Sequence, residues 1–321
     1  MRIDWQEEKL GKEIFQAIPF KIIGVGDLGC TVVDSLCAEG FYPDHCLMIG
    51  LEPWRESRCP VIINLYKHNP PRGLHFGHDP AWCLEAINNA KKKICRTLEG
   101  SSLNVIVAGI GGVMEISVCP FIADISRELV ALTIAVISSP FSFEGNSRMK
   151  MARMGLEKMQ SRADMTIQIP YERLEKTLRS ELTIVAVFQY ASKLLGKAVK
   201  DVCRFMLTKQ DYFGGDFETK KIFLQKAGIA YMGFGEGDII MEAMVNSISS
   251  PLLGEDTLQK AGLVFANIHG RSNVTFEEVS ETLTILQNKV SKDTSLGYEL
   301  FINEEIGVSL IATKIRNKNQ E

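Results

Sequence analysis

Residues 20–29, Phe20-Lys21-Ile22-Ile23-Gly24-Val25-Gly26-Asp27-Leu28-Gly29, carry the clearest indication of fold class in this 321-residue chain. Residues 20–25 form an apolar run of the length of a buried strand, and residues 32–38 form an apolar segment of helical character. The glycines between them allow a tight connection. A strand, a tight turn and a helix in this order predict the first unit of an α/β fold.

The same alternation continues through the first half of the chain. Strand-like apolar runs stand at residues 47–51, 61–66, 103–108 and 132–137. Amphipathic or apolar helical segments stand at residues 81–99 and 121–129, with Pro120 at the first turn of the second helix, where proline is tolerated. Apolar strands that alternate with helices predict a parallel sheet with both faces covered, and such sheets bind ligands at the carboxyl ends of their strands.

The second half predicts a long helix and a smaller α/β domain. Residues 181–207 contain no proline and a single glycine, so we expect one continuous helix there. After it, the pattern predicts helices near residues 239–249 and 275–290 and strands near residues 261–268 and 306–314. A long helix of this kind is a natural divider between two domains.

Composition excludes several classes of protein. The formal net charge is −3 and 45% of the residues are hydrophobic, which does not suit a nucleic-acid-binding protein or a disordered chain. No apolar run has the length of a membrane span, and the polar N-terminus has no apolar stretch of the length of an export signal. The eight cysteines form no C-x-x-C pair, as is typical of thiols in a reduced compartment. We therefore expect a cytoplasmic protein without a nucleic-acid partner.

The turn from Gly24 to Gly29 matches the pattern G-x-G-x-x-G between a strand and a helix. In dinucleotide-binding folds this turn places a pyrophosphate on backbone amides at the start of the helix, and Glu52 would then contact a ribose hydroxyl. A tight strand-to-helix connection without a ligand has the same spacing. Taken alone, the motif leaves both interpretations open.

One cluster has spacing that a metal site could use. His75 and His78 form an H-x-x-H, with His68 and Cys83 nearby in the sequence. A single H-x-x-H without a second pair of ligands is more often ordinary loop chemistry, so we expect no metal. The histidines would instead suit an altered pocket for anions, which imidazoles bind when protonated.

Five segments, in the same order along the chain, resemble FtsZ, the bacterial member of the tubulin superfamily. They are residues 108–112 (AGIGG), residues 140–145 (PFSFEG) followed by Arg148, and residues 164–170, 228–233 and 248–253. The likeness runs from about residue 20 to residue 314. It implies a tubulin/FtsZ-like α/β fold with a Rossmann-like GTPase-type nucleotide domain over residues 1–180, a central helix over 181–210 and a C-terminal α/β domain over 211–321.

The resemblance also implies a nucleotide site, in which GTP or GDP would bind with Mg²⁺. Phe188 on the central helix would stack on the base, and the other expected contacts come from the glycine turns and from the 140–148 segment. The residues that would be retained from such a site are Gly24, Gly26, Gly29, Gly111, Gly112, Glu144, Arg148 and Phe188.

The sequence departs from the family pattern at the same place. Asp27, Leu28 and Cys30 replace three glycines of the first loop, and residues 111–117 (GGVMEIS) keep only the first two glycines of the phosphate loop. Glu115 adds a carboxylate there, and Lys193 replaces the acid that would bind guanine. Two unit like charges ~5 Å apart cost about 3 kcal/mol at an effective dielectric of ~20. We therefore expect Asp27, Glu115 and Lys193 to disrupt the pocket.

The catalytic acids expected by resemblance are also incomplete. In the family, the second domain of one subunit supplies two acids to the nucleotide of its neighbour. Asp216 stands at the first of these positions, and Thr219 replaces the second. Asp216 would equally serve as the N-cap of a helix over residues 217–224. If the chain is an enzyme, we expect a GTPase from which most catalytic residues are missing.

The sequence thus predicts an FtsZ/tubulin-like cytoskeletal or cell-division protein with a degenerate GTP site. It would act as a structural or regulatory subunit, forming homo-oligomers or binding an authentic FtsZ through longitudinal contacts, without a direct membrane anchor. One alternative is a slow, self-assembling GTPase with a rebuilt pocket. Another is a binder of dinucleotides or other small ligands at the Gly24–Gly29 turn.

Overall fold

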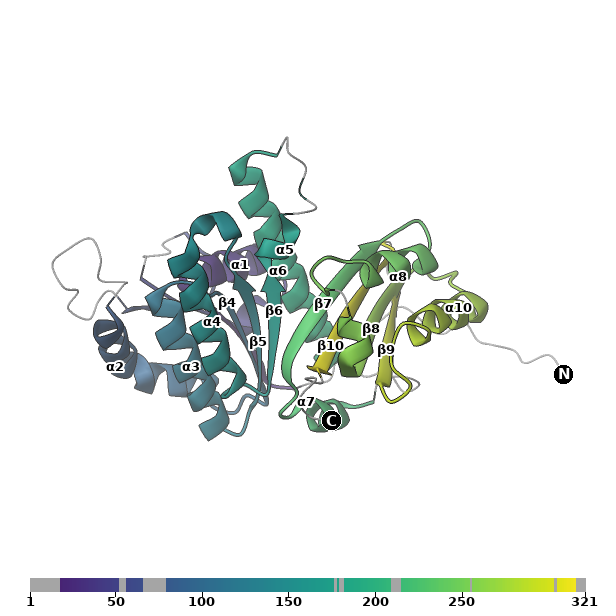
Figure 1. Cartoon of the computed structure of the whole chain (residues 1–321). Coiled ribbons are helices and arrows are strands. Elements are labelled where there is room, and N and C mark those ends of the chain that lie inside the picture. The colour runs from purple at the N-terminus through teal and green to yellow at the C-terminus, as the bar shows by residue number, and fades with distance from the viewer. Residues whose placement is uncertain are drawn as a thin grey trace. The chain divides into compact units, whose positions relative to one another are not determined.

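The computed structural model describes residues 18–51, 56–65, 79–175, 178, 182–208, 215–254, 256–302 and 305–315. The chain packs into two compact units (Figure 1). The larger unit lies within residues 18–203 and 221–231, and the smaller unit lies within residues 204–220 and from residue 232 onward. Strand β7 and helices α6 and α7 each begin in one unit and end in the other.

A parallel sheet forms the centre of the larger unit. Its strands lie in the order β3-β2-β1-β4-β5-β6-β7, and each pairing between neighbours in this series is parallel. The prediction of a parallel-sheet α/β fold is therefore confirmed. The strands are β1 (Phe20–Val25), β2 (Cys46–Gly50), β3 (Val61–Asn64), β4 (Leu103–Gly109), β5 (Leu132–Ser139), β6 (Met165–Pro170) and β7 (Gly228–Glu236).

Helices cover both faces of this sheet. Figure 1 shows α2, α3 and α4 on the near face and α1 behind it. Apolar side chains from β1, β2 and β4 pack against α2 and α3 in a single core, because these strands have apolar residues on both faces. The helices are α1 (Gly26–Ala38), η1 (Pro43–His45), α2 (Pro80–Leu98), α3 (Val113–Glu128), η4 (Ser142–Glu144), α4 (Asn146–Gln160), α5 (Tyr171–Leu174), α6 (Ile184–Leu207) and α7 (Phe217–Leu224).

Helix α3 corrects one prediction about a helix start. The helix begins at Val113, so Pro120 lies inside it rather than in its first turn. Proline has no N–H to donate to the carbonyl of Ile116, one turn earlier, and a local rule therefore places it near a helix end. The buried side chains along α3, among them Cys119 and Ile122, offset that loss through their packing on the sheet.

The strand order changes direction at β1, in the larger unit. Strand β1 lies between β2 and β4, with Gly24 opposite both Met48 and Val107. The connection after β1 leads to β2 on one side, whereas β4 lies on the other side. Such a change of direction opens a crevice at the carboxyl ends of the strands, and ligands bind there in α/β sheets. The first turns of α1 and α3 flank this crevice.

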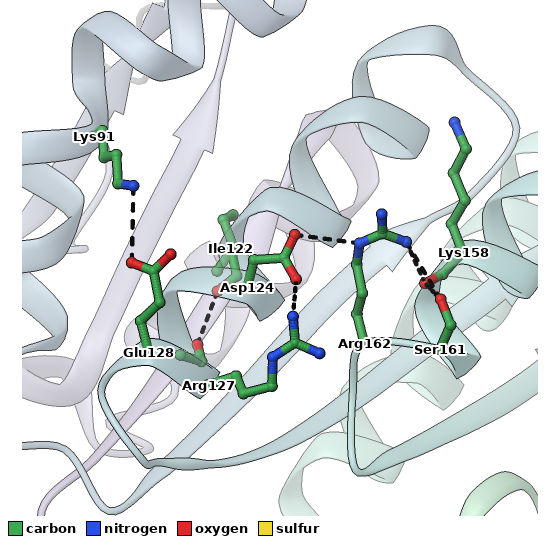
Figure 2. Close-up of polar contacts among 9 residues, drawn as sticks. Lys91, Ile122, Asp124, Arg127, Glu128, Lys158, Ser161 and Arg162 are labelled. Carbon is green, nitrogen blue, oxygen red and sulfur yellow. Dashed lines mark hydrogen bonds and ion pairs between the residues drawn. The ribbon is translucent and has the colours of Figure 1, made fainter.

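The opposite end of the sheet carries a group of surface ion pairs (Figure 2). Asp124 on α3 pairs with Arg127 at 2.7 Å and with Arg162, just beyond α4, at 3.2 Å. Lys91 on α2 lies 3.7 Å from Glu128. Exposed pairs of this kind contribute only about 0.2–1 kcal/mol each, so they fasten the ends of neighbouring helices rather than form a site.

The smaller unit contains a mixed sheet in which the second part of β7 is followed by β10, β8 and β9. Strand β8 is antiparallel to β10 and parallel to β9. The sequence pattern did not predict β9, because Gly297 and Glu299 interrupt its apolar run. The elements are α8 (Ile240–Ile248), α9 (Thr257–Lys260), β8 (Ala261–Gly270), α10 (Phe276–Gln287), β9 (Ser295–Ile302) and β10 (Gly307–Ile315).

A buried ion pair lies in the core of the smaller unit. The side chains of Lys220 and Glu299 are 1% and 0% exposed, and the Lys220 ammonium contacts the Glu299 carboxylate. The same ammonium donates hydrogen bonds to the carbonyls of Phe205 at 2.5 Å and Thr208 at 2.8 Å. Burial lowers the pKa of Lys220, and the Glu299 carboxylate opposes that shift.

Candidate functional site

The first glycine turn joins β1 to α1 and needs glycine for two different reasons. Gly26, the first residue of α1, has φ +72°, a conformation that side-chain-bearing residues rarely adopt. Gly24 and Gly29 are instead required by close packing. A Cβ on Gly29 would lie 2.2 Å from the carbonyl oxygen of Val107, and one on Gly24 would lie 2.5 Å from that of Gly29. These two glycines hold α1 tightly against β1 and β4.

The second glycine turn joins β4 to α3. Gly112 is the N-cap residue of α3, and Glu115 is the third residue of that helix. A glutamate at this position can return to the backbone N–H of the N-cap residue, as in a capping box. The Gly112 amide and the amide of Glu115 itself both act on the Glu115 carboxyl, in the direction that lowers its pKa.

The Glu115 carboxylate lies between the two glycine turns. A Cβ placed on Gly26 would lie 2.1 Å from Glu115 Oε1, and a Cβ placed on Gly112 would lie 2.3 Å from Oε2. One carboxylate oxygen is therefore directed to each turn. The carboxylate fills space that the absence of two side chains leaves open, beside Gly26 at the start of α1 and near the Gly112 amide at the start of α3.

This position is unfavourable for the charged form of Glu115. Burial raises the pKa of its carboxyl to about 7 from the usual 4.5, and the Asp27 carboxylate adds to the rise. The Arg148 guanidinium and the two backbone amides act in the opposite direction without cancelling it. Of the two acids that the sequence singled out, Asp27 is exposed, while Glu115 lies inside the crevice.

Glu144 and Arg148 lie together at the edge of the same crevice. Arg148 Nε is 3.2 Å from Glu144 Oε2, and Glu144 Oε1 accepts a hydrogen bond of 2.9 Å from the backbone N–H of Phe141. The Arg148 side chain also covers Gly111, since a Cβ there would lie 3.1 Å from its Nε. The two residues thus form an ion pair, and Arg148 is placed beside the second turn.

An aromatic cluster forms the other part of the candidate site. It consists of Phe141, Phe143, Tyr171 and Phe188. The ring of Phe188 lies 5.6 Å from that of the buried Phe141 and 6.4 Å from that of Phe143. Phe143 is 59% exposed and Phe188 is 41% exposed, so the cluster offers flat apolar surface to a ligand.

Ser192 and Lys193, which follow Phe188 on α6, do not extend the apolar surface of the aromatic cluster. The Ser192 hydroxyl donates a 2.9 Å hydrogen bond back to the Phe188 carbonyl within the helix. Lys193 is exposed, and its charge contributes, after that of Lys200, to the lowered pKa of Glu39 beyond the end of α1. Tyr171 fixes the helix by donating a 2.9 Å hydrogen bond to the carbonyl of Ala191.

Asp216 lies in the smaller unit, immediately before α7. Its Oδ1 accepts a hydrogen bond of 2.9 Å from the backbone N–H of Thr219, as expected of an N-cap residue. Of the two roles that the sequence left open, helix capping is therefore present.

Several sequence hypotheses concern residues outside the described part of the chain. Glu52, His68, His75 and His78 lie there. Among the residues that the structure does describe, no group of three or more His, Cys, Asp or Glu side chains is placed to hold a metal ion. All eight cysteines are free thiols, and no helix in the described ranges is long and apolar enough to cross a membrane.

Comparison with known proteins gives consistent matches over this chain. Residues 20–179 match the Tubulin/FtsZ family, GTPase domain. The cell division protein FtsZ of Methanothermobacter thermautotrophicus is 32% identical over 291 residues, which cover 89% of this chain and 75% of that protein. The chain belongs to the tubulin/FtsZ family. The membership is consistent with the order of segments by which the sequence resembles FtsZ.

Two further members of the tubulin/FtsZ family extend the comparison. Cell division protein FtsZ 1 of Thermococcus kodakarensis is 29% identical over 303 residues, which cover 92% of this chain and 80% of that one. A structure of M. jannaschii FtsZ, described as an empty dimer, superposes with a TM-score of 0.82 at 26% identity, covering 93% of this chain and 88% of that one. The tubulin/FtsZ-like fold is therefore confirmed.

The sequence did not predict that the Glu115 carboxylate lies against both glycine turns, at Gly26 and at Gly112. The sequence placed Glu115 near the phosphate loop, but not in contact with Gly26. A partial signal was available, since glutamate three residues after an N-cap glycine is typical of a side chain that turns back to the helix start. The contact with Gly26 could be predicted only from the adjacency of β1 and β4.

Proposed function

We propose that the chain is a cytoplasmic, cell-division-related subunit of the FtsZ type that associates with itself or with another FtsZ, and that its own site binds GTP and GDP weakly. Family membership and near full-length similarity to FtsZ proteins support the first part. The M. jannaschii relative is described as a dimer, which supports self-association.

The position of the Glu115 carboxylate between Gly26 and Gly112 carries the second part of the proposal. A nucleotide phosphate would need the amides and the open space that these turns provide. One unit like-charge pair at ~5 Å costs about 3 kcal/mol at an effective dielectric of ~20, which is roughly a hundredfold in affinity. Asp27 adds a further negative charge, and Mg²⁺ would offset part of the repulsion.

A slow, self-assembling GTPase with a rebuilt pocket is the second candidate function. The exposed rings of Phe143 and Phe188 favour it, because they keep an apolar surface on which a base could stack. Arg148, which lies over Gly111, would supply a cation for a phosphate. A thermal-shift comparison with GTP, ATP and NAD separates this candidate from a dinucleotide binder at the Gly24–Gly29 turn.

We assign Asp216 a structural role before a catalytic one. Its carboxylate already caps α7 through the Thr219 amide, and Thr219 itself stands where the resemblance implies a second acid. A subunit with this segment would join a filament without contributing full catalytic power to the nucleotide of its neighbour. We therefore propose a structural or regulatory subunit.

Sedimentation of assemblies tests the proposal. The chain is centrifuged alone and mixed with M. jannaschii FtsZ, with and without GTP and Mg²⁺, and GTP turnover is measured in parallel. We expect no GTP-dependent pellet from the chain alone, but co-sedimentation or altered turnover in the mixture. Robust GTP-dependent filaments and turnover by the chain alone would overturn the weak-site part of the proposal. If the mixture shows no effect, association with another FtsZ is rejected and only self-association remains. Analytical ultracentrifugation without nucleotide then confirms or rejects self-association.

A further inference from the structure

We propose that Glu115 is an internal anion that holds the place of a ligand's phosphate at both glycine turns, and that a phosphate-bearing ligand binds there only when this carboxyl is protonated. The inference rests on the proposed function in one respect, because it takes the two turns as the position for a phosphate. It goes further in assigning a proton to the binding event and one residue as the determinant of affinity.

The Glu115 carboxylate occupies a position that suits an anion. The starts of α1 and α3, each with its helix dipole behind it, act in favour of a negative group in the space between Gly26 and Gly112, while burial and the Asp27 carboxylate act against one. Glu115 Oε1 faces one turn and Oε2 faces the other. A tethered group competes at high effective concentration, so an external phosphate must act against a ligand that is always present.

Protonation is the simplest way for Glu115 to make room for a phosphate. The neighbouring residues Val113, Met114 and Ile116 are buried, so the first turn of α3 is fixed against the sheet and cannot move away as a unit. A rotated but ionised side chain would still carry its charge beside the turns and near Asp27. A protonated carboxyl removes the repulsion and gains an O–H donor, which can bond to a phosphate oxygen.

The groups around Glu115 agree with this role. The titratable and charged groups that interact electrostatically with Glu115 are Asp27 and Cys30 on α1, Cys83 on α2, Cys119 on α3 and Arg148 on α4. Burial raises the pKa of each of the three thiols, so they stay neutral near physiological pH. Asp27 favours the protonated carboxyl and Arg148 opposes it, but Arg148 is shared with Glu144. The resulting pKa of about 7 places the proton exchange in the physiological range.

The size of the effect follows from the protonated fraction. With a pKa of about 7 in the free protein, roughly nine tenths of Glu115 is protonated at pH 6 and roughly one tenth at pH 8. Affinity for a phosphate-bearing ligand should therefore fall about tenfold between pH 6 and pH 8. Removal of the charge, as in Glu115→Gln, should abolish this part of the pH dependence.

The test is calorimetric titration of the full chain with GDP and Mg²⁺ at pH 6 and pH 8, for the wild type and Glu115→Gln. The titration of GDP itself is common to both proteins and cancels in the comparison. We expect the wild type to lose about tenfold in affinity relative to Glu115→Gln across this range, and the variant to bind more tightly at pH 8. Equal pH dependence in the two proteins would overturn the proposal.

A second measurement does not depend on the variant folding. Wild-type binding enthalpies at pH 8 are compared in buffers of different ionisation enthalpy, which counts the protons taken up. We expect close to one proton for each GDP bound, and no uptake would overturn the proposal. Glu115→Asp serves as a matched variant, because its shorter side chain keeps the charge but cannot reach both turns. At pH 8, a GDP affinity between that of the wild type and that of Glu115→Gln supports the proposal. A GDP affinity equal to that of Glu115→Gln contradicts it.

Failure of this inference can be told apart from failure of the proposed function. If neither the wild type nor Glu115→Gln binds GDP at either pH, the internal-anion proposal is wrong while the weak site stands. If the wild type binds GDP tightly at both pH values without proton uptake, both proposals are wrong.

Discussion

Glu299 in the smaller unit is fully buried and Glu115 in the larger unit is half-buried, and the surroundings of the two carboxylates differ. Glu299 contacts the Lys220 ammonium, which also donates to two backbone carbonyls. Glu115 lies against two glycine turns and near a second carboxylate, Asp27. Arg148, the cation that acts on Glu115, is itself paired with Glu144. The first carboxylate is matched by a cation, whereas the second is not.

The difference separates two roles of a carboxyl group that the fold shields from solvent. The Lys220–Glu299 pair is part of a packed core, where a matched pair is tolerated and the loss of one partner is costly. Glu115 occupies a crevice at the carboxyl ends of β1 and β4, and its charged form is disfavoured there. Perturbed carboxyls of this second kind gather at functional sites. The comparison therefore assigns Glu299 to stability and Glu115 to the control of ligand binding.

Breaking the matched pair should give the largest effect on stability. Lys220→Met leaves the Glu299 carboxylate buried without its cation, and we expect the free energy of unfolding to fall by about 3–5 kcal/mol. Urea denaturation measures the change. The double variant Lys220→Met with Glu299→Leu should recover most of the loss, and a single variant as stable as the wild type would contradict the assignment.

Neutralising the unmatched carboxylate should act in the opposite direction. The folded-state pKa of Glu115 is raised to about 7 from 4.5, so the folded protein holds this proton more tightly than the unfolded chain does. Stability is therefore lost as the pH rises between these two values. Relative to Glu115→Gln, the wild type should lose roughly 2 kcal/mol of unfolding free energy between pH 5 and pH 8.

Urea midpoints of the two proteins at both pH values provide the measurement. The control is Glu157→Gln on the exposed part of α4, which should follow the wild type at each pH. A wild-type profile parallel to that of Glu115→Gln would show that the Glu115 carboxyl is not perturbed in the folded state.

The aromatic cluster allows the contribution of a base to be separated from that of the phosphates in ligand binding. In a Glu115→Gln background, Phe188→Ala removes the exposed ring on α6 and should weaken GDP binding by about 1 kcal/mol, roughly fivefold. Pyrophosphate, which has no base, should bind equally well to both proteins. If pyrophosphate binding falls by the same factor, Phe188 supports the glycine turns rather than a base.

Asp216 provides a third carboxylate, placed at a helix start. Asp216→Ala removes the hydrogen bond to the Thr219 amide and should cost about 1 kcal/mol of unfolding free energy, with Asp216→Asn closer to the wild type. Urea denaturation again gives the value. In mixtures with M. jannaschii FtsZ, both variants should leave GTP turnover unchanged, and a loss of turnover would give Asp216 a catalytic role.

Much of the fold could be predicted because local patterns and packing agree. The strand at residues 20–25, the glycine turn and the long helix up to Leu207 follow from apolar runs and the positions of glycine. Strand β9 could not be predicted in the same way, since Glu299 interrupts its apolar pattern and is matched only by Lys220, far away in the sequence. The predicted start of α3 was wrong. The preference of proline for the first turn of a helix was outweighed by the burial of the apolar side chains along α3.

The candidate site was predictable in its members and not in its contacts. Glu115 and Asp27 were recognised as acids beside a phosphate loop, and Glu144 and Arg148 as retained members of the nucleotide site, but not as an ion pair. The contact between Glu115 and Gly26 depends on the pairing of β1 with β4, which a single sequence does not contain. The burial that raises the pKa of Glu115 is likewise a property of the folded crevice.

Crystals of the wild-type protein are soaked in GDP and Mg²⁺ at pH 6 and at pH 8, at a GDP concentration that fills only part of the protein. We expect less GDP phosphate between Gly26 and Gly112 at pH 8 than at pH 6, with the Glu115 carboxylate in that space in the remaining molecules. Equal phosphate occupancy at the two pH values would contradict the control of binding by Glu115.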